Sequence, residues 1–198
     1  MATNYLSADE ALLERMVRVV EKVRERLKRA AAALEAASIP YAVAGGNAVA
    51  AWVATVDESA IRNTQDVAIL VRRADFDRVK AAPEAAGFVY RHAASIDMFL
   101  DGPAAKARDA VHILFANEKV RQEYSRPAPD VENPFMDKGA RILPLESVID
   151  IKCMSFRDKD RTHLRDLIDV GLVDVSWCAK LPPELAGRLQ QLLDNPDG

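Results

Sequence analysis

Apolar positions along the chain follow two periods, and each period predicts one kind of element. A stripe at helical spacing runs from Leu13 to Leu34 among charged residues, which predicts one long amphipathic helix over residues 8–37. The Ser-x-x-Glu capping box at residues 7–10 favours a helix start there. Apolar runs at residues 41–44, 67–71 and 110–116 have the length of buried strands. The pattern predicts an α/β (α+β) fold, with a mixed sheet flanked by helices.

The second half of the chain is richer in helical patterns. A helix over residues 72–86 should be interrupted by Pro83, and strands are expected near residues 88–90 and 96–100. Residues 117–138 are polar and contain three prolines, which is typical of a flap or a partly ordered excursion. Helices are expected at residues 145–156, 161–172 and 184–193. We therefore divide the chain into an N-terminal helix (1–38), an α/β core (39–143) and a helical part of the same domain (144–198).

Composition narrows the class of protein. The 198 residues are 49% hydrophobic and 29% charged with a net charge of -3, which does not indicate a general nucleic-acid binder. No apolar run is long enough to span a bilayer and no signal-peptide pattern opens the chain, so we expect a cytoplasmic protein without a membrane partner. Cys153 and Cys178 are isolated, which predicts reduced thiols and neither a zinc site nor a disulfide.

The candidate chemistry begins where the first predicted strand ends. Gly45 and Gly46 follow residues 41–44, and glycine permits a turn with positive φ and a close approach to a ligand. Asn47 is then a suitable N-cap for an apolar helix. The free N–H groups and positive dipole end of that helix would lie beside the glycines. This arrangement predicts an anion site.

A second cluster lies where the next predicted strands begin. Residues two apart on a strand share a face, so Asp66 and position 68 should point to one spot, about 6–7 Å apart along the chain. Two carboxylates there would hold Mg²⁺ or Mn²⁺ on a triphosphate, but Ala68 leaves only one. His112 is expected nearby, as a general base, a phosphate donor or a soft-metal ligand. A strand-end histidine satisfied by a neighbouring carbonyl is equally compatible with the sequence.

These residues together resemble the pattern of the nucleotidyltransferase superfamily. That pattern is a Gly-Gly or Gly-Ser turn, a helix, and an Arg-x-Thr-x-Asp-x-Asp stretch on the next strand. Here it corresponds to Gly45-Gly46, Arg62, Thr64 and Asp66, with Ala68 in place of the second aspartate. Small prokaryotic members of the AbiEii-toxin-like group are the most similar, and the resemblance covers residues 39–173.

The resemblance implies a set of site residues. In the group, a lysine-rich and then Arg/Asp-rich helical pair contributes to the site, and Lys152 could neutralise a γ-phosphate. The alternative for the arginines and aspartates of this pair is an ion pair between helices. The implied catalytic residues are Asp66, His112 and Lys152; the implied nucleotide-binding residues are Gly45, Gly46, Asn47, Arg62, Thr64, Lys152 and Asp166; and Asp66 would hold Mg²⁺ or Mn²⁺.

Three functional hypotheses follow from the resemblance. The first is a nucleotidyltransferase that binds a nucleoside triphosphate with Mg²⁺ and transfers a nucleotidyl group to an RNA, protein or small-molecule acceptor. Its activity would be weakened or lost because Ala68 replaces a metal-binding aspartate. The second is an inactive nucleotide- or protein-binding module. The third is a toxin–antitoxin component that uses the long first helix and residues 117–138 for protein contacts. The sequence leaves all three open, together with the oligomeric state.

Overall fold

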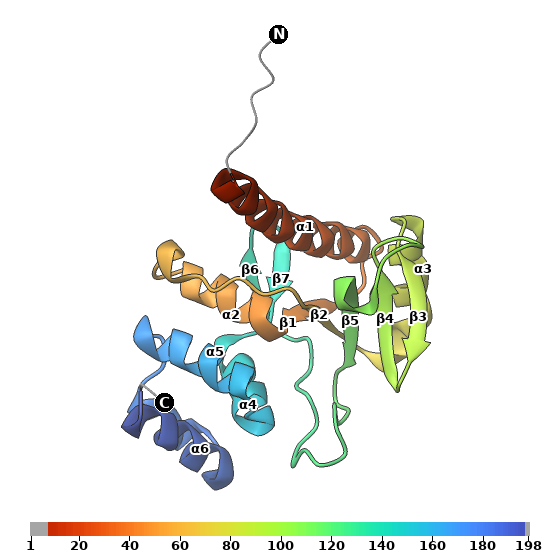
Figure 1. The fold of residues 1–198 in the computed structure, drawn as a ribbon. Helices are drawn as coiled ribbons and strands as arrows, with labels where there is room; N and C mark the ends of the chain where they lie inside the picture. The colour runs from red at the N-terminus through yellow and green to blue at the C-terminus, as the bar shows by residue number, and fades with distance from the viewer. Residues whose placement is uncertain (1–7, 197–198) are drawn as a thin grey trace.

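The computed structural model describes residues 8–196, which fold into one sheet with helices packed around it (Figure 1). The strands are β1 (Tyr41–Ala44), β2 (Val67–Val71), β3 (Val89–Ala93), β4 (Ile96–Leu100), β5 (Ala110–Phe115), β6 (Phe135–Asp137) and β7 (Ala140–Ile142). The α-helices are α1 (Ala8–Ala36), α2 (Gly45–Ala54), α3 (Phe76–Ala85), α4 (Leu145–Ser155), α5 (Asp158–Asp169) and α6 (Pro183–Asp194). The predicted α/β class with a mixed sheet is confirmed.

The three strands expected from apolar runs form the centre of the sheet. Within the described part of the chain the strand order is β3-β4-β5-β2-β1-β7-β6. Strand β2 runs antiparallel to β1 and parallel to β5, so Ala68 lies opposite both Ala44 and His112. This register brings the end of β1 next to the first residues of β2 and β5.

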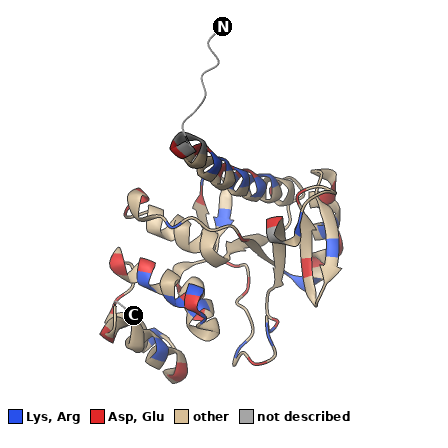
Figure 2. Ribbon diagram, in the orientation of Figure 1, with Lys and Arg blue, Asp and Glu red and all other residues tan. Residues whose placement is uncertain are grey.

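Helix α1 lies across the sheet and contacts β2, β5, β7 and α3 (Figure 1). The C-terminal part of its apolar stripe, including Val23, Ala31 and Leu34, is buried, whereas Leu13 and Met16 near the other end are exposed. Basic and acidic residues alternate along the outer side of the helix (Figure 2). Ser7 of the predicted capping box lies outside the described residues.

The helices of the C-terminal part pack on one another and reach α2. Helix α5 contacts α2, α4 and α6, and buries Leu164 and Leu167. The chain reverses between α4 and α5 at Phe156, whose φ of 45° is left-handed. Because of this reversal, the charged residues of α4 and α5 lie together beside the start of α2.

One local prediction is wrong and another holds only in part. Helix α3 continues to Ala85 without a break, because Pro83 lies in its last turn, where only one intrahelical hydrogen bond is lost. Residues 117–134 of the segment predicted as an excursion contain no helix or strand, as expected, but the segment ends in strand β6, which pairs with β7. Trp52 anchors this hairpin to α2: its ring stacks on Phe135 with 4.5 Å between centroids, and its indole nitrogen donates to the carbonyl of Leu143 at 2.9 Å.

Two further sequence expectations concern thiols and membranes. Cys153 is buried, Cys178 is half-buried, and neither forms a disulfide. Burial raises the pKa of the Cys153 thiol to about 12, so this thiol is unreactive at neutral pH. Among the helices in residues 8–196, none combines the length and the apolar character that a membrane crossing requires.

Candidate nucleotide-binding site

Helix α2 begins directly at the end of β1. Gly45 has a φ of 69°, which lets the chain enter the helix without a connecting loop, and Ala44 is the N-cap. The prediction that Asn47 is the N-cap is therefore wrong, because Asn47 lies inside the first turn of helix α2. Its side-chain amide instead donates to the backbone carbonyl of Asp66 at 2.8 Å. This bond joins the start of α2 to the mouth of β2.

Gly46 is enclosed by side chains from two other segments. A Cβ atom at this position would lie 2.9 Å from the hydroxyl oxygen of Thr64 and 3.2 Å from Cε1 of His163. Real Cβ atoms essentially never approach a neighbour as closely as the first of these distances. Thr64 comes from the loop before β2 and His163 from α5, so three segments converge on the first turn of α2. Glycine is required here for space, because its φ is not positive.

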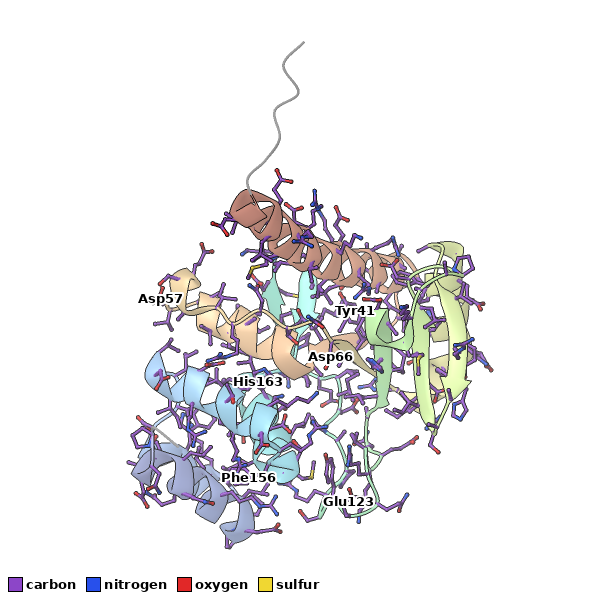
Figure 3. All side chains as sticks on the ribbon, in the orientation of Figure 1. Tyr41, Asp57, Asp66, Glu123, Phe156 and His163 are labelled. Carbon is purple, nitrogen blue, oxygen red and sulfur yellow. The ribbon has the colours of Figure 1, made fainter. Side chains whose placement is uncertain are left out.

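Asp66 lies exposed at the mouth of β2, as predicted (Figure 3). One of its carboxylate oxygens accepts a hydrogen bond from Nζ of Lys159 at 3.2 Å, and both side chains are more than half exposed. Exposed ion pairs contribute little to stability, so a ligand can displace this contact at small cost.

The two positions beside Asp66 carry no acid. Ala68 points at the turn, since its Cβ lies 3.4 Å from the position of a Cβ on Gly45. His112 lies opposite Ala68 on β5. No described residue forms a hydrogen bond with its ring, so within residues 8–196 no backbone carbonyl accepts a hydrogen bond from it. Burial lowers the pKa of His112, the Asp66 carboxylate opposes that shift, and the Lys159 ammonium adds to it. His112 is therefore neutral at neutral pH.

This donor set does not fit a resident divalent ion. Mg²⁺ prefers oxygen ligands in octahedral geometry. In residues 8–196, no group of three or more histidine, cysteine, aspartate or glutamate side chains is arranged to hold a metal. Of the two carboxylates expected to hold the ion, the chain has only that of Asp66, since position 68 is alanine, and the Asp66 carboxylate accepts a hydrogen bond from Lys159. The residues present do not make a magnesium site by themselves.

Lys152 is buried behind the turn. Its Nζ donates to Oδ1 of Asp160 at 2.8 Å and lies 2.9 Å from Nδ1 of His163. Asp160 is also fully buried, and accepts further hydrogen bonds from Ser155 and Arg157, each at 2.7 Å. Burial alone would raise the pKa of Asp160, but these hydrogen bonds from Arg157 and Lys152 hold it well below its usual range. Lys152 therefore reaches the turn through His163.

Arg62 and Asp166, both expected to bind nucleotide, bind each other. The Arg62 guanidinium donates to both carboxylate oxygens, with Nε and Nη2 each at 3.0 Å from its nearer oxygen. Asp166 is nearly buried, whereas Arg62 is mostly exposed. The pair fastens the loop that carries Thr64 to helix α5.

Comparisons with known proteins agree with this architecture. No family profile and no curated protein sequence matches the chain. A crystal structure of an antigenic nucleotidyltransferase-like protein from Paracoccidioides brasiliensis superimposes with a TM-score of 0.50 and 18% identity, covering 97% of this chain and 91% of that one. The chain has a nucleotidyltransferase-like fold.

Two structures of the antibiotic-resistance factor ANT(2'')-Ia superimpose less well. The solution structure gives a TM-score of 0.47 at 13% identity, covering 92% of this chain and 93% of that one. The complex with adenylyl-2''-tobramycin gives 0.45 at 14% identity, covering 86% and 96%. None of the three structures bears on the AbiEii-toxin-like group.

Within this nucleotidyltransferase-like fold, most of the predicted residues meet at the start of α2. Lys159, a member of the helical pair that the resemblance pointed to, also lies there, and so does His163, which the sequence did not single out. His163 stands in an amphipathic helix with no motif around it, and its link to Lys152 depends on how α4 and α5 pack. The sequence contained no local signal for that contact.

Proposed function

We propose that this protein binds the phosphates of a nucleoside triphosphate at the Gly45-Gly46 turn and is a nucleotidyltransferase with weak transfer activity. The observation that carries the proposal is the start of α2, which has no side-chain cap and which Thr64, His163 and the mouth of β2 approach. A helix N-terminus without a side-chain cap keeps N–H groups free for an anion.

Charge around the turn supports the same ligand. Among residues 8–196, the contact of the Lys159 side chain is an exposed ion pair with Asp66, so its ammonium can turn to a bound phosphate. Asp66 would then be free to accept a proton from an attacking hydroxyl. In-line attack of that hydroxyl on the α-phosphate breaks the bond to the β-phosphate and releases pyrophosphate, and it requires such positioning together with neutralisation of the developing charge. The acceptor would be an RNA end, a protein hydroxyl or a small molecule.

The identities of Ala68 and His112 indicate that transfer of the nucleotidyl group is slow. The carboxylate that would share a face with Asp66 is absent at position 68, and the neighbouring strand offers a neutral imidazole. Nucleotide binding depends on the turn, whereas transfer depends on charge neutralisation at the α-phosphate. We therefore expect affinity for the nucleotide to exceed catalytic competence. The same observation favours a second candidate function, a nucleotide-binding module without chemistry.

Binding is tested by titration calorimetry with ATP, GTP, CTP and UTP, each with and without Mg²⁺. We expect at least one triphosphate to bind, and Gly46→Glu to abolish binding because its side chain would displace Thr64 and His163 and its carboxylate would repel the phosphates. A native circular dichroism spectrum of the variant separates this result from misfolding. Gly187→Glu is the matched control, since nothing lies within 4 Å of a Cβ at Gly187 in helix α6. Absence of heat for all four ligands at millimolar concentration would contradict the proposal.

Transfer is tested separately with α-labelled triphosphates and RNA or protein acceptors. Slow labelling by the wild-type chain that accelerates in Ala68→Asp supports an impaired nucleotidyltransferase. If the wild-type protein and Ala68→Asp both bind the triphosphate and neither labels an acceptor, the result supports the nucleotide-binding module without chemistry.

A further inference from the structure

The side chain of His163 is held in one orientation by a buried chain of charged groups. Its Nδ1 lies 2.9 Å from Nζ of Lys152, and that Nζ lies 2.8 Å from the carboxylate of Asp160. Lys152 and Asp160 are both almost inaccessible to solvent, with side-chain exposures of 5% and 1%. A buried ion pair of this kind has little freedom to rearrange, so the imidazole is fixed from behind.

This contact also determines which ring nitrogen carries the proton. Burial lowers the pKa of Lys152, but the ionised Asp160 opposes that shift and accepts a hydrogen bond from Nζ, which favours the ammonium form. An ammonium group has only donors. The Nδ1 atom of His163 must therefore accept, and in the neutral ring the proton resides on Nε2. Burial, and next the nearby Lys152 ammonium, lower the pKa of His163 to about 4, so the ring is neutral at physiological pH.

The ring carbon between the two nitrogens lies against the glycine turn. Cε1, the atom bonded to both ring nitrogens, is 3.2 Å from the position of a Cβ on Gly46. No described residue hydrogen-bonds to Nε2, in contrast to Nδ1. The ring therefore has one N–H donor without a partner among the described residues, and this donor is bonded to the carbon that contacts the turn.

We propose that His163 binds the triphosphate through this Nε2–H group, with Lys152 and Asp160 as positioning residues that fix its tautomer. The inference rests on the proposed function, because it names a further donor of the same site. A neutral donor suits this place, since it adds a hydrogen bond to an anionic oxygen without placing a second positive charge beside the buried Lys152. Lys152 acts through the imidazole and does not itself contact the phosphate.

The tautomer is measured without any ligand. Nitrogen-15 chemical shifts of the His163 ring in labelled wild-type protein should identify Nε2 as the protonated nitrogen. In Lys152→Met the ring should populate both tautomers, because Nδ1 has lost its donor. A wild-type spectrum with the proton on Nδ1 would overturn the inference, whether or not a nucleotide binds.

The hydrogen bond is measured with ATP and with inorganic triphosphate as probes. A hydrogen bond to a charged group predicts that His163→Ala weakens binding of both probes roughly tenfold or more. His163→Gln should retain most of the affinity, because its side-chain amide can donate from nearly the same position as Nε2. The matched control is His92→Ala, which removes another hydrogen-bonded histidine that lies on β3 and pairs with Asp97.

The outcomes separate this inference from the proposed function. If wild-type protein binds neither probe, the proposed function fails, and the tautomer measurement still tests the link between Lys152 and His163. If both probes bind and His163→Ala binds them as tightly as the wild type, the inference alone is wrong. Equal losses in His163→Ala and His163→Gln would also overturn it, since the ring would then serve only to pack the turn.

Discussion

Replacement of Gly46 by alanine tests the convergence of three segments on the first turn of α2. The new methyl group would lie 2.9 and 3.0 Å from Oγ1 and Cβ of Thr64 and 3.2 Å from Cε1 of His163. None of these atoms is the end of a long flexible side chain, and Thr64 is further restrained because the Arg62–Asp166 pair fastens its loop. Overpacking of a close-packed region costs about 1–3 kcal/mol. For a chain of this length, such a cost lowers Tm by roughly 2–12 °C.

Thermal unfolding followed by circular dichroism measures this change. Gly187→Ala is the control, because its methyl group meets nothing within 4 Å and alanine is a better helix former by about 1 kcal/mol. The two substitutions should therefore shift Tm in opposite directions. In a Thr64→Ala background the cost of Gly46→Ala should shrink, because the shortest contact is gone. A Gly46→Ala protein as stable as Gly187→Ala would refute the packing described for the turn.

Three further predictions concern the charges around the turn. Lys152→Met should lower the free energy of unfolding in urea by about 3 kcal/mol, because it leaves the buried Asp160 carboxylate with one partner fewer. Lys159→Met should lower it by less than about 1 kcal/mol, because its ion pair is exposed. Equal losses would contradict the burial of Lys152. Because the pKa of His163 is about 4 in the folded chain and near 6.5 when unfolded, the unfolded state binds more protons between these values. Stability should accordingly fall by about 1–2 kcal/mol from pH 7 to pH 5 in the wild type, and by less in His163→Gln; identical pH profiles would argue against a neutral buried ring. Ala68→Asp should be slightly less stable than the wild type without metal and should gain Tm on addition of Mg²⁺ or Mn²⁺, and a Tm that ignores both ions would show that position 68 does not face Asp66.

The sequence was sufficient to predict the centre of the fold. The apolar runs that became β1, β2 and β5 carry their own signal, because a strand buried on both faces is continuously apolar. The Gly45-Gly46 pair and Asp66 were predicted to meet for the same reason, since both flank such strands. Strands β6 and β7 are only three residues long, which is too short for any periodicity to show.

The rest of the site depends on contacts between distant segments. Lys152 was expected to face the phosphates directly, but the reversal at Phe156 brings Asp160 and His163 against it. The sequence gives no signal for that reversal, because phenylalanine seldom adopts a left-handed conformation and is not expected to end a helix in this way. The prediction of Asn47 as the N-cap failed for a related reason: helix α2 starts three residues earlier than that N-cap implies, because Gly45 adopts a positive φ at the end of β1.

The location of a bound nucleotide tests the central claim most directly. A crystal structure of the protein with a non-hydrolysable nucleoside triphosphate should place the phosphates over Gly45 and Gly46, between Thr64 and His163. Phosphates bound away from this turn, for example deeper in the adjoining cavity of about 660 Å³ that Asn47, Arg62 and Thr64 also line, would contradict the account.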